Sequence, residues 1–112
     1  MESILDTIKD MLGSSTEYDD FDKELIVYIN TALNVLYQLG VGPKGFHITS
    51  NAETWNDFLP DIDRFHMVKD FIYLKVKQAF DPNQNSNITA EYNKQIDELT
   101  WRINVEIESG EE

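Results

Sequence analysis

The chain of 112 residues contains no cysteine and only two histidines, His47 and His66. Without cysteine it has no disulfide, no thiolate metal ligand and no thiol nucleophile. Two histidines are too few for a histidine-rich metal site, and neither has the helical spacing to a partner that zinc proteases use. No serine stands in a Gly-x-Ser-x-Gly turn. The sequence therefore predicts no enzyme, no metal and no cofactor.

Basic residues are also scarce. Nine lysines and arginines face 21 aspartates and glutamates, and the net charge of −12 should repel nucleic acid and anionic lipid. The only clearly positive stretch runs from 64 to 77, where one acid accompanies four bases: Arg64, Lys69, Lys75 and Lys77. Two interpretations are open. The charges belong to solvated helix faces, or this basic stretch meets an acidic surface of the next copy in head-to-tail self-association.

Long apolar runs are missing as well. No stretch approaches the roughly 20 residues of a membrane span, and the acidic start Met1–Asp6 lacks the features of a signal peptide. Apolar residues nevertheless make up 41% of the chain and aromatic residues 12%, which is typical of a folded protein. We therefore expect one soluble, unexported domain over 1–112, in a cytosolic setting.

Apolar residues recur at helical spacing and predict an all-α fold, a small bundle of four to five helices. A first stripe begins at Ile4 and closes at Gly13. The clearest helix runs from Phe21 to Gly40, with Asp19 or Asp20 as its cap.

Further helices follow. The capping box Ser50-Asn51-Ala52-Glu53 predicts a short helix over 51–59 that ends before Pro60. Asp61 or Asp63 opens the next helix, which stops at Phe80-Asp81-Pro82. The last helix carries the stripe Tyr92, Ile96, Leu99, Ile103 and Ile107, and residues 106–112 are expected to form a frayed acidic tail.

The segment after the clearest helix is rich in glycine and carries aromatic residues that a plain linker does not need. It predicts a shaped contact loop or small hairpin, with 46–49 as loop, short strand or hairpin arm and Phe46 as an exposed anchor. With the basic stretch, this loop supplies the candidate residues for contacts with other subunits or partners: Gly40, Val41, Gly42, Phe46, His47 and Ile48, with Arg64, Lys69, Lys75 and Lys77.

Two ligand motifs match in spacing only. The glycines at 40, 42 and 45 have the spacing of a dinucleotide fingerprint, but a helix precedes them where a strand is required. Asp81, Asn83 and Asn85 have the spacing of a calcium loop, but Tyr92 stands where a bidentate glutamate is needed. In place of a calcium site, the sequence predicts a plain connection between helices.

Each tryptophan has two interpretations. Trp55 is expected to fold back onto the long helices. Trp101 lies off the main apolar stripe but pairs with Val105 four residues later, so it either widens the core face, which is favoured, or marks an intermolecular face.

Three ordered runs carry a family resemblance. The first run is Leu33-Asn34-x-Leu36-x-x-Leu39-Gly40-Val41-Gly42, followed by Phe46-x-Ile48-Thr49 and Thr54-Trp55-x-Asp57-Phe58-Leu59. The second is Val68-Lys69-x-Phe71-Ile72-Tyr73-Leu74-Lys75-Val76-Lys77, followed by Phe80-Asp81-Pro82. The third is Gln95-Ile96-x-Glu98-Leu99-x-Trp101-Arg102-Ile103-Asn104. Together they resemble the head–tail connector proteins, also called head-completion or adaptor proteins, of long-tailed bacteriophages. The resemblance extends from Ile4 to Val105.

The resemblance implies a structural protein of a virion or prophage, assembled in the bacterial cytoplasm. Such subunits form a ring under the portal, matching its twelvefold symmetry, that joins the DNA-filled head to the tail and extends the DNA channel. The implied partners are further copies of the chain, the portal protein and a stopper or tail-completion protein, while DNA passes without specific binding. An alternative stays open. A small, acidic, helical protein could instead mimic DNA and inhibit a basic nucleic-acid-binding protein.

Overall fold

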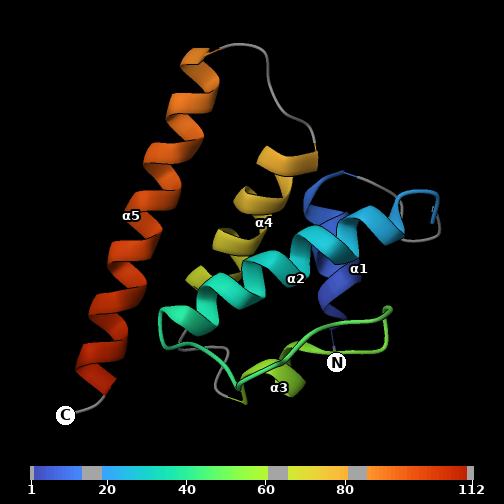
Figure 1. The fold of residues 1–112 in the computed structure, drawn as a ribbon, viewed down its shortest axis with the longest axis horizontal. Coiled ribbons are helices and arrows are strands. Elements are labelled where there is room, and N and C mark those ends of the chain that lie inside the picture. Colours follow the sequence, from blue (N-terminus) through green and yellow to red (C-terminus); the bar gives the residue numbers. More distant parts are fainter. Residues whose placement is uncertain (1, 14–18, 61–65, 81–85, 111–112) are drawn as a thin grey trace.

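The computed structural model describes residues 2–13, 19–60, 66–80 and 86–110 (Figure 1). It contains five helices: α1 (Ile4–Met11), α2 (Asp22–Gln38), α3 (Trp55–Phe58), α4 (Met67–Phe80) and α5 (Ser86–Gly110). Within these described ranges the only strand-like pairing is an isolated antiparallel bridge between Ser3 and Thr54. The predicted all-α fold is confirmed, and of the alternatives open for 46–49 the structure shows the loop, because that segment is irregular.

Helix α4 lies at the centre of the molecule. It packs against α2 on one side and α5 on another, while α1 contacts both α4 and α2. Figure 1 shows α5 along one edge of the molecule, with α3 and the loop before it beneath α2. The molecule measures 43 × 36 × 21 Å, and its smallest dimension corresponds to about two helix diameters. The helices are therefore packed about two deep along this direction, and the core lies between them.

Helix α2 follows its predicted apolar stripe, because Leu25, Ile29 and Leu36 are all buried. The predicted cap is wrong. Phe21 occupies the N-cap position without a side-chain cap, and Asp19 contributes only its backbone carbonyl, which accepts from the Asp22 N–H at 3.2 Å. Acidic residues in the first turn still place negative charge at the positive end of the helix dipole.

The short helix α3 begins later than predicted. Its capping box is Thr54 and Asp57, not Ser50 and Glu53: the Asp57 N–H donates to Thr54 Oγ1 at 3.3 Å, and the Thr54 N–H donates to Asp57 Oδ2 at 2.9 Å. The reason lies in the chain's first residues. The Ile4 N–H donates to the Glu53 carbonyl at 3.1 Å, and the Trp55 N–H donates to the Glu2 carbonyl at 3.2 Å. This pairing keeps Thr54 extended, so no helix can start before it.

The boundaries of the last two helices also differ from prediction. Helix α4 begins at Met67, after the predicted Asp61 or Asp63, and residues 61–65 lie outside the described part of the chain. Residues 81–85, with the predicted connection, also lie outside it. Helix α5 begins at Ser86 and continues to Gly110, past position 106 where fraying was expected.

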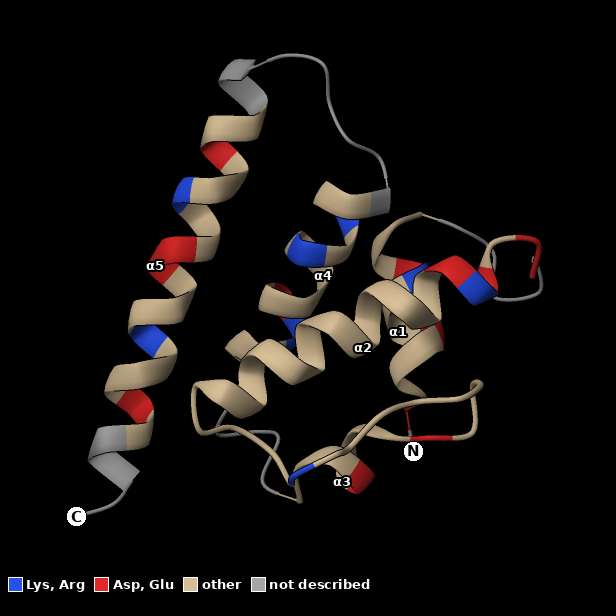
Figure 2. Ribbon diagram, in the orientation of Figure 1, with Lys and Arg blue, Asp and Glu red and all other residues tan. Residues whose placement is uncertain are grey.

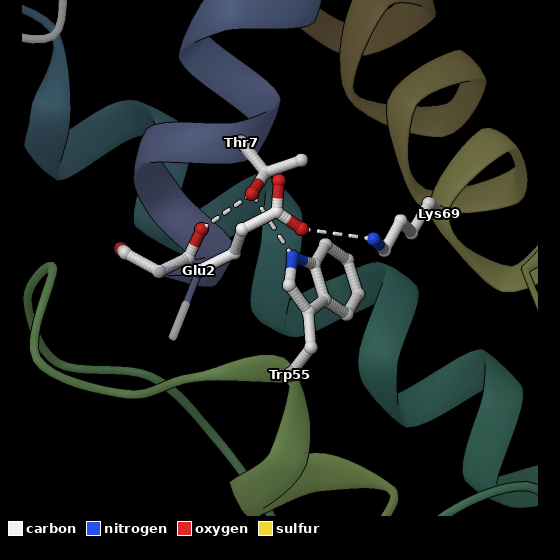
Figure 3. Close-up of polar contacts among 5 residues, drawn as sticks. Glu2, Thr7, Trp55 and Lys69 are labelled. Atoms are coloured by element: carbon white, nitrogen blue, oxygen red, sulfur yellow. Dashed lines mark hydrogen bonds and ion pairs between the residues drawn. The ribbon is translucent and has the colours of Figure 1, made fainter. Parts of the chain in front are cut away.

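Trp55 folds back onto the helices as predicted and is buried. Figure 3 shows its indole between α1 and α4. Its Nε1–H donates to Thr7 Oγ1 at 3.0 Å, and the Thr7 hydroxyl donates to the Ser3 carbonyl at 2.7 Å. Lys69 Nζ lies 5.4 Å from the ring centroid and 3.0 Å from Glu2 Oε2. This cluster fastens α3 to both α1 and α4.

Candidate contact surfaces

The glycine-rich loop begins with a Schellman motif at the end of α2. Gly40 has φ +99°, its N–H donates to the Tyr37 carbonyl at 2.9 Å, and the Val41 N–H donates to the Leu36 carbonyl at 2.8 Å. Both Val41 and Leu36 are buried, which supplies the apolar contact that usually accompanies this motif. The predicted termination of the helix at Gly40 is confirmed, and Val41 faces the core.

Gly42 is where the loop comes closest to α3. Its φ is +90°, and a Cβ added there would overlap the ring of Phe58. Phe46 also packs against Phe58, with 5.3 Å between the two ring centroids. Phe46 is therefore partly buried against the core, and its predicted exposure is wrong.

Asn30 on α2 holds the middle of the loop. Its Nδ2 donates to the Ile48 carbonyl at 3.0 Å, and the Ile48 N–H donates to Asn30 Oδ1 at 2.7 Å. The carboxamide thus pairs with Ile48 as a peptide group pairs across an antiparallel sheet. The sequence analysis did not identify Asn30, although a polar residue beside the apolar stripe of α2 is a recognisable signal for such a contact.

Glu53 closes the far end of the loop. Its carboxylate accepts from the Thr49 hydroxyl at 2.8 Å, from the Thr49 N–H at 3.1 Å and from the Ser50 N–H at 3.2 Å. Burial alone would raise the pKa of Glu53, but these hydrogen bonds, together with one from its own backbone N–H, outweigh it and hold the pKa below its usual value. The loop is thereby fixed at both ends and at its centre.

This anchoring decides which loop residues can meet a partner. Of the six predicted contact residues in the loop, Val41 and Ile48 are buried, Gly42 and Phe46 are partly buried, and Gly40 and His47 are exposed. His47 Nδ1 lies 3.0 Å from the Gly45 carbonyl. The outward surface of the loop is formed by Pro43, Lys44, Gly45, His47 and Thr49.

The predicted basic surface is divided by internal contacts. Arg64 lies outside the described residues. Lys69 is engaged with Glu2 and Trp55, and Lys77 Nζ lies 3.3 Å from the Tyr73 hydroxyl and 5.7 Å from the Tyr73 ring centroid. Lys75 instead lines a groove. The three bases in the described part of the chain, Lys69, Lys75 and Lys77, therefore have separate surroundings and do not form one continuous positive face.

The groove beside Lys75 lies between α2 and α4 and has a volume of about 160 Å³. Its walls are formed by Tyr28, Thr31, Ala32, Lys75, Gln78 and Ala79. We call it the α2–α4 groove. Among the described residues Lys75 is the one charged residue that lines it, so this lining is locally positive on a strongly acidic protein.

A second groove of about 370 Å³ lies among α1, α4 and α5. Met11, Leu74 and Leu99 contribute apolar surface to it. Its charged residues are Asp70, Glu98 and Arg102, and an ion pair of 2.8 Å joins the last two. Its charged lining carries a net negative charge, in contrast to the α2–α4 groove.

Large apolar side chains are exposed on two different helices, α2 and α5. Val27 on α2 is 60% exposed, and Trp101 and Val105 on α5 are 65% and 40% exposed. Phe21 and Tyr37, at the two ends of α2, are also exposed. Core packing of Trp101, the favoured interpretation of the sequence, is wrong. Trp101 and Val105 lie two residues from the buried Ile103, and two residues correspond to about 200° around a helix.

Carboxylates are distributed over the surface of the molecule. Figure 2 shows acidic positions on α1, at the start of α2, on α3 and along α5. Among the described residues, no group of three His, Asp or Glu side chains is arranged to hold a metal ion. No helix in the described ranges is long and apolar enough to cross a bilayer.

Comparison with known proteins identifies the class. The family model of phage connector proteins matches residues 4–110, nearly the whole chain. The chain therefore belongs to the phage connector protein family. It is a structural phage protein and a virion component that associates with other head or tail proteins, and its family is not typically enzymatic. No curated protein and no solved structure matches it.

Proposed function

We propose that the protein assembles into a ring beneath the portal of a DNA-filled head, where it joins head to tail and extends the DNA channel. Its neighbours are further copies of itself, the portal protein and a stopper or tail-completion protein. The observation that carries this proposal is the match to the connector family over residues 4–110.

The distribution of exposed apolar side chains supports ring formation. A closed ring needs heterologous contacts, in which one face of a subunit complements a different face of the next. The exposed residues of α2 and of α5 lie on different elements, so each can meet the other in a neighbouring copy. The twelvefold symmetry of the portal sets the copy number that such a ring should match.

The charge of the chain supports a passage for DNA. A channel wall that bound phosphate would retard the genome, whereas carboxylates at the wall repel it. With 21 acids against nine bases, the chain carries ample carboxylate for such a wall. Replacing the acids that line the channel by lysine should slow DNA ejection and leave ring assembly intact. Unchanged ejection kinetics would contradict the channel role.

Electron microscopy of tailless, DNA-packaged heads mixed with this protein tests the proposal. A new ring of density below the portal is the expected result, and its reconstruction would show which acids face the channel. Heads incubated without the protein are the control. Bare portals at saturating protein would overturn the proposal. Pull-downs at graded salt concentration would then test the interpretation as an acidic mimic of DNA, since such binding must weaken steeply with salt.

A further inference from the structure

We propose that Trp101 on α5 of one subunit docks into the α2–α4 groove of the next subunit. The occupant of the groove is thus a second copy of this chain. The inference rests on the proposed function, because the ring is the assembly in which the two surfaces meet.

The inserting surface is the outer face of α5. Trp101 and Val105 are one helical turn apart and lie on the side of α5 opposite the buried Ile96 and Ile103. Figure 1 shows α5 along the edge of the molecule, and it packs mainly on α4. A tryptophan that is 65% exposed beside a second exposed apolar residue has the composition of an interface centre.

The receiving surface is the α2–α4 groove with Val27 at its rim. Val27 lies one turn before Thr31, which lines the groove, and it is 60% exposed. Ala32 and Ala79 contribute small apolar side chains to the groove, and its volume of about 160 Å³ suits one inserted ring rather than a large ligand. Burying Trp101 there would cover Val27 at the same time.

Charge selects this groove over the larger one. Asp97 lies one turn before Trp101 on the same face of α5. In the α2–α4 groove Asp97 would meet Lys75, whose ammonium can also contact the indole ring. In the larger groove it would meet Asp70 beside the Glu98–Arg102 ion pair, a charged lining that is net negative. Two copies that each carry a charge of −12 repel one another, so the contact is expected where a base faces an acid.

The contact is heterologous, because the inserting surface and the receiving surface are different parts of the chain. A pair of subunits keeps one free groove, on one subunit, and one free Trp101, on the other, so addition continues until the ring closes. A symmetric α5–α5 dimer would instead use the same face twice and would stop at two subunits.

Cross-linking tests the pairing directly, because the chain has no cysteine of its own. Thr31→Cys and Val105→Cys are made separately, in chains of different mass, and treated with a short bismaleimide in the presence of tailless heads. The expected product joins position 31 of one chain to position 105 of the other. Asp10→Cys, exposed on α1 and not among the residues of the groove, replaces Thr31→Cys as the control and should give much less product.

Two sets of variants supply an independent measurement. Trp101→Ala should bind its neighbour about 30-fold more weakly, as expected for an interface tryptophan, with an unchanged unfolding midpoint because the side chain is exposed. Lys75→Glu and Asp97→Lys should each reduce ring assembly, and the double variant should restore it because the two charges are exchanged.

The outcomes separate this inference from the proposed function. Rings on heads without the 31–105 product, or rings that Trp101→Ala leaves unchanged, overturn the inference and leave the proposed function standing. A 105–105 product overturns the inference in favour of a symmetric α5 contact. If no ring forms on heads, the proposed function fails. Cross-linking of the concentrated free protein then decides the contact, and the absence of the 31–105 product there overturns the inference too.

Discussion

The side chain of Asn30 and the backbone of Ile48 exchange two hydrogen bonds, of 3.0 and 2.7 Å, across 18 residues of sequence. Through this pair the middle of α2 positions the centre of the glycine-rich loop. The loop is consequently a fixed feature of the surface, and its exposed residues are presented in one arrangement.

Asn30→Leu removes both hydrogen bonds and leaves the Ile48 N–H and carbonyl without their partner. We expect it to lower the free energy of unfolding by about 1–3 kcal/mol. Urea denaturation followed by circular dichroism measures this change. Asn34→Leu, exposed one turn further along α2, is the matched control and should change stability by less than about 0.5 kcal/mol. Equal effects at both positions would contradict the pairing.

Two glycines of the same loop allow steric overlap to be separated from backbone strain. Gly42 and Gly45 have φ values of +90° and +76°, but only at Gly42 would an added Cβ meet another residue, the ring of Phe58. We expect Gly45→Ala to cost about 1 kcal/mol and Gly42→Ala about 2 kcal/mol more. Thermal unfolding of both variants tests this. If the two variants unfold at the same temperature, the close approach of Phe58 does not add to the loss of stability caused by Gly42→Ala.

The lowered pKa of Glu53 makes the stability of the loop depend on pH. A carboxylate whose pKa is lower in the folded state contributes stability above its unfolded pKa of about 4.3 and loses it as pH falls through the folded value. Glu53→Gln should therefore be less stable than the native chain by about 1 kcal/mol at neutral pH, and the difference should shrink in acid.

Denaturant titrations at pH 7 and at about pH 3 measure this difference. Thr49→Val, which removes one donor to Glu53, should show the same trend with a smaller amplitude. A difference between the native chain and Glu53→Gln that is constant over this pH range would argue against the hydrogen-bonded carboxylate as its cause.

Lys9 is a buried cation on α1, 1% exposed, with its Nζ 2.9 Å from Asp22 Oδ1 at the start of α2. Removing one partner of a buried pair leaves the other charge without compensation. Asp22→Asn should lower the free energy of unfolding by about 1–3 kcal/mol, below the full cost of a buried pair because Asp22 is partly exposed.

Chemical denaturation measures this loss. The exposed Asp20 provides the control, since Asp20→Asn removes the same charge nearby. If Asp20→Asn destabilises the protein as much as Asp22→Asn does, general charge reduction rather than the ion pair is responsible.

The helical part of the fold follows from local patterns. The spacing of Leu25, Ile29 and Leu36 and the glycine at position 40 determine α2 and its end, since both depend on neighbours in sequence. The start of α3 could not be predicted in this way. Ser50 and Glu53 form a valid capping pattern, but pairing with Glu2 and Ile4 holds Thr54 extended, and that contact is not visible in the local sequence.

The candidate surfaces were predicted less completely. The enrichment of aromatic residues at interfaces predicts an exposed Phe46, and Ile48 is a predicted contact residue, yet Phe58 and Asn30 hold them towards the core. For Trp101 the sequence favours core packing over an intermolecular face, and the structure shows it exposed. Its position two residues from Ile103 already places it on the opposite side of α5, so helix geometry was the better guide there.

The pairing of residues 2–4 with residues 53–55 has a consequence for the order of events during synthesis. The first turn of α1 is complete only when a segment about fifty positions later has left the ribosome. At about 5–20 residues per second, this interval is roughly 3–10 seconds. During it the apolar side of α1 has neither Trp55 nor α4 to cover it, so a nascent chain stalled before position 55 should bind chaperones that a chain extended past the end of α4 no longer needs.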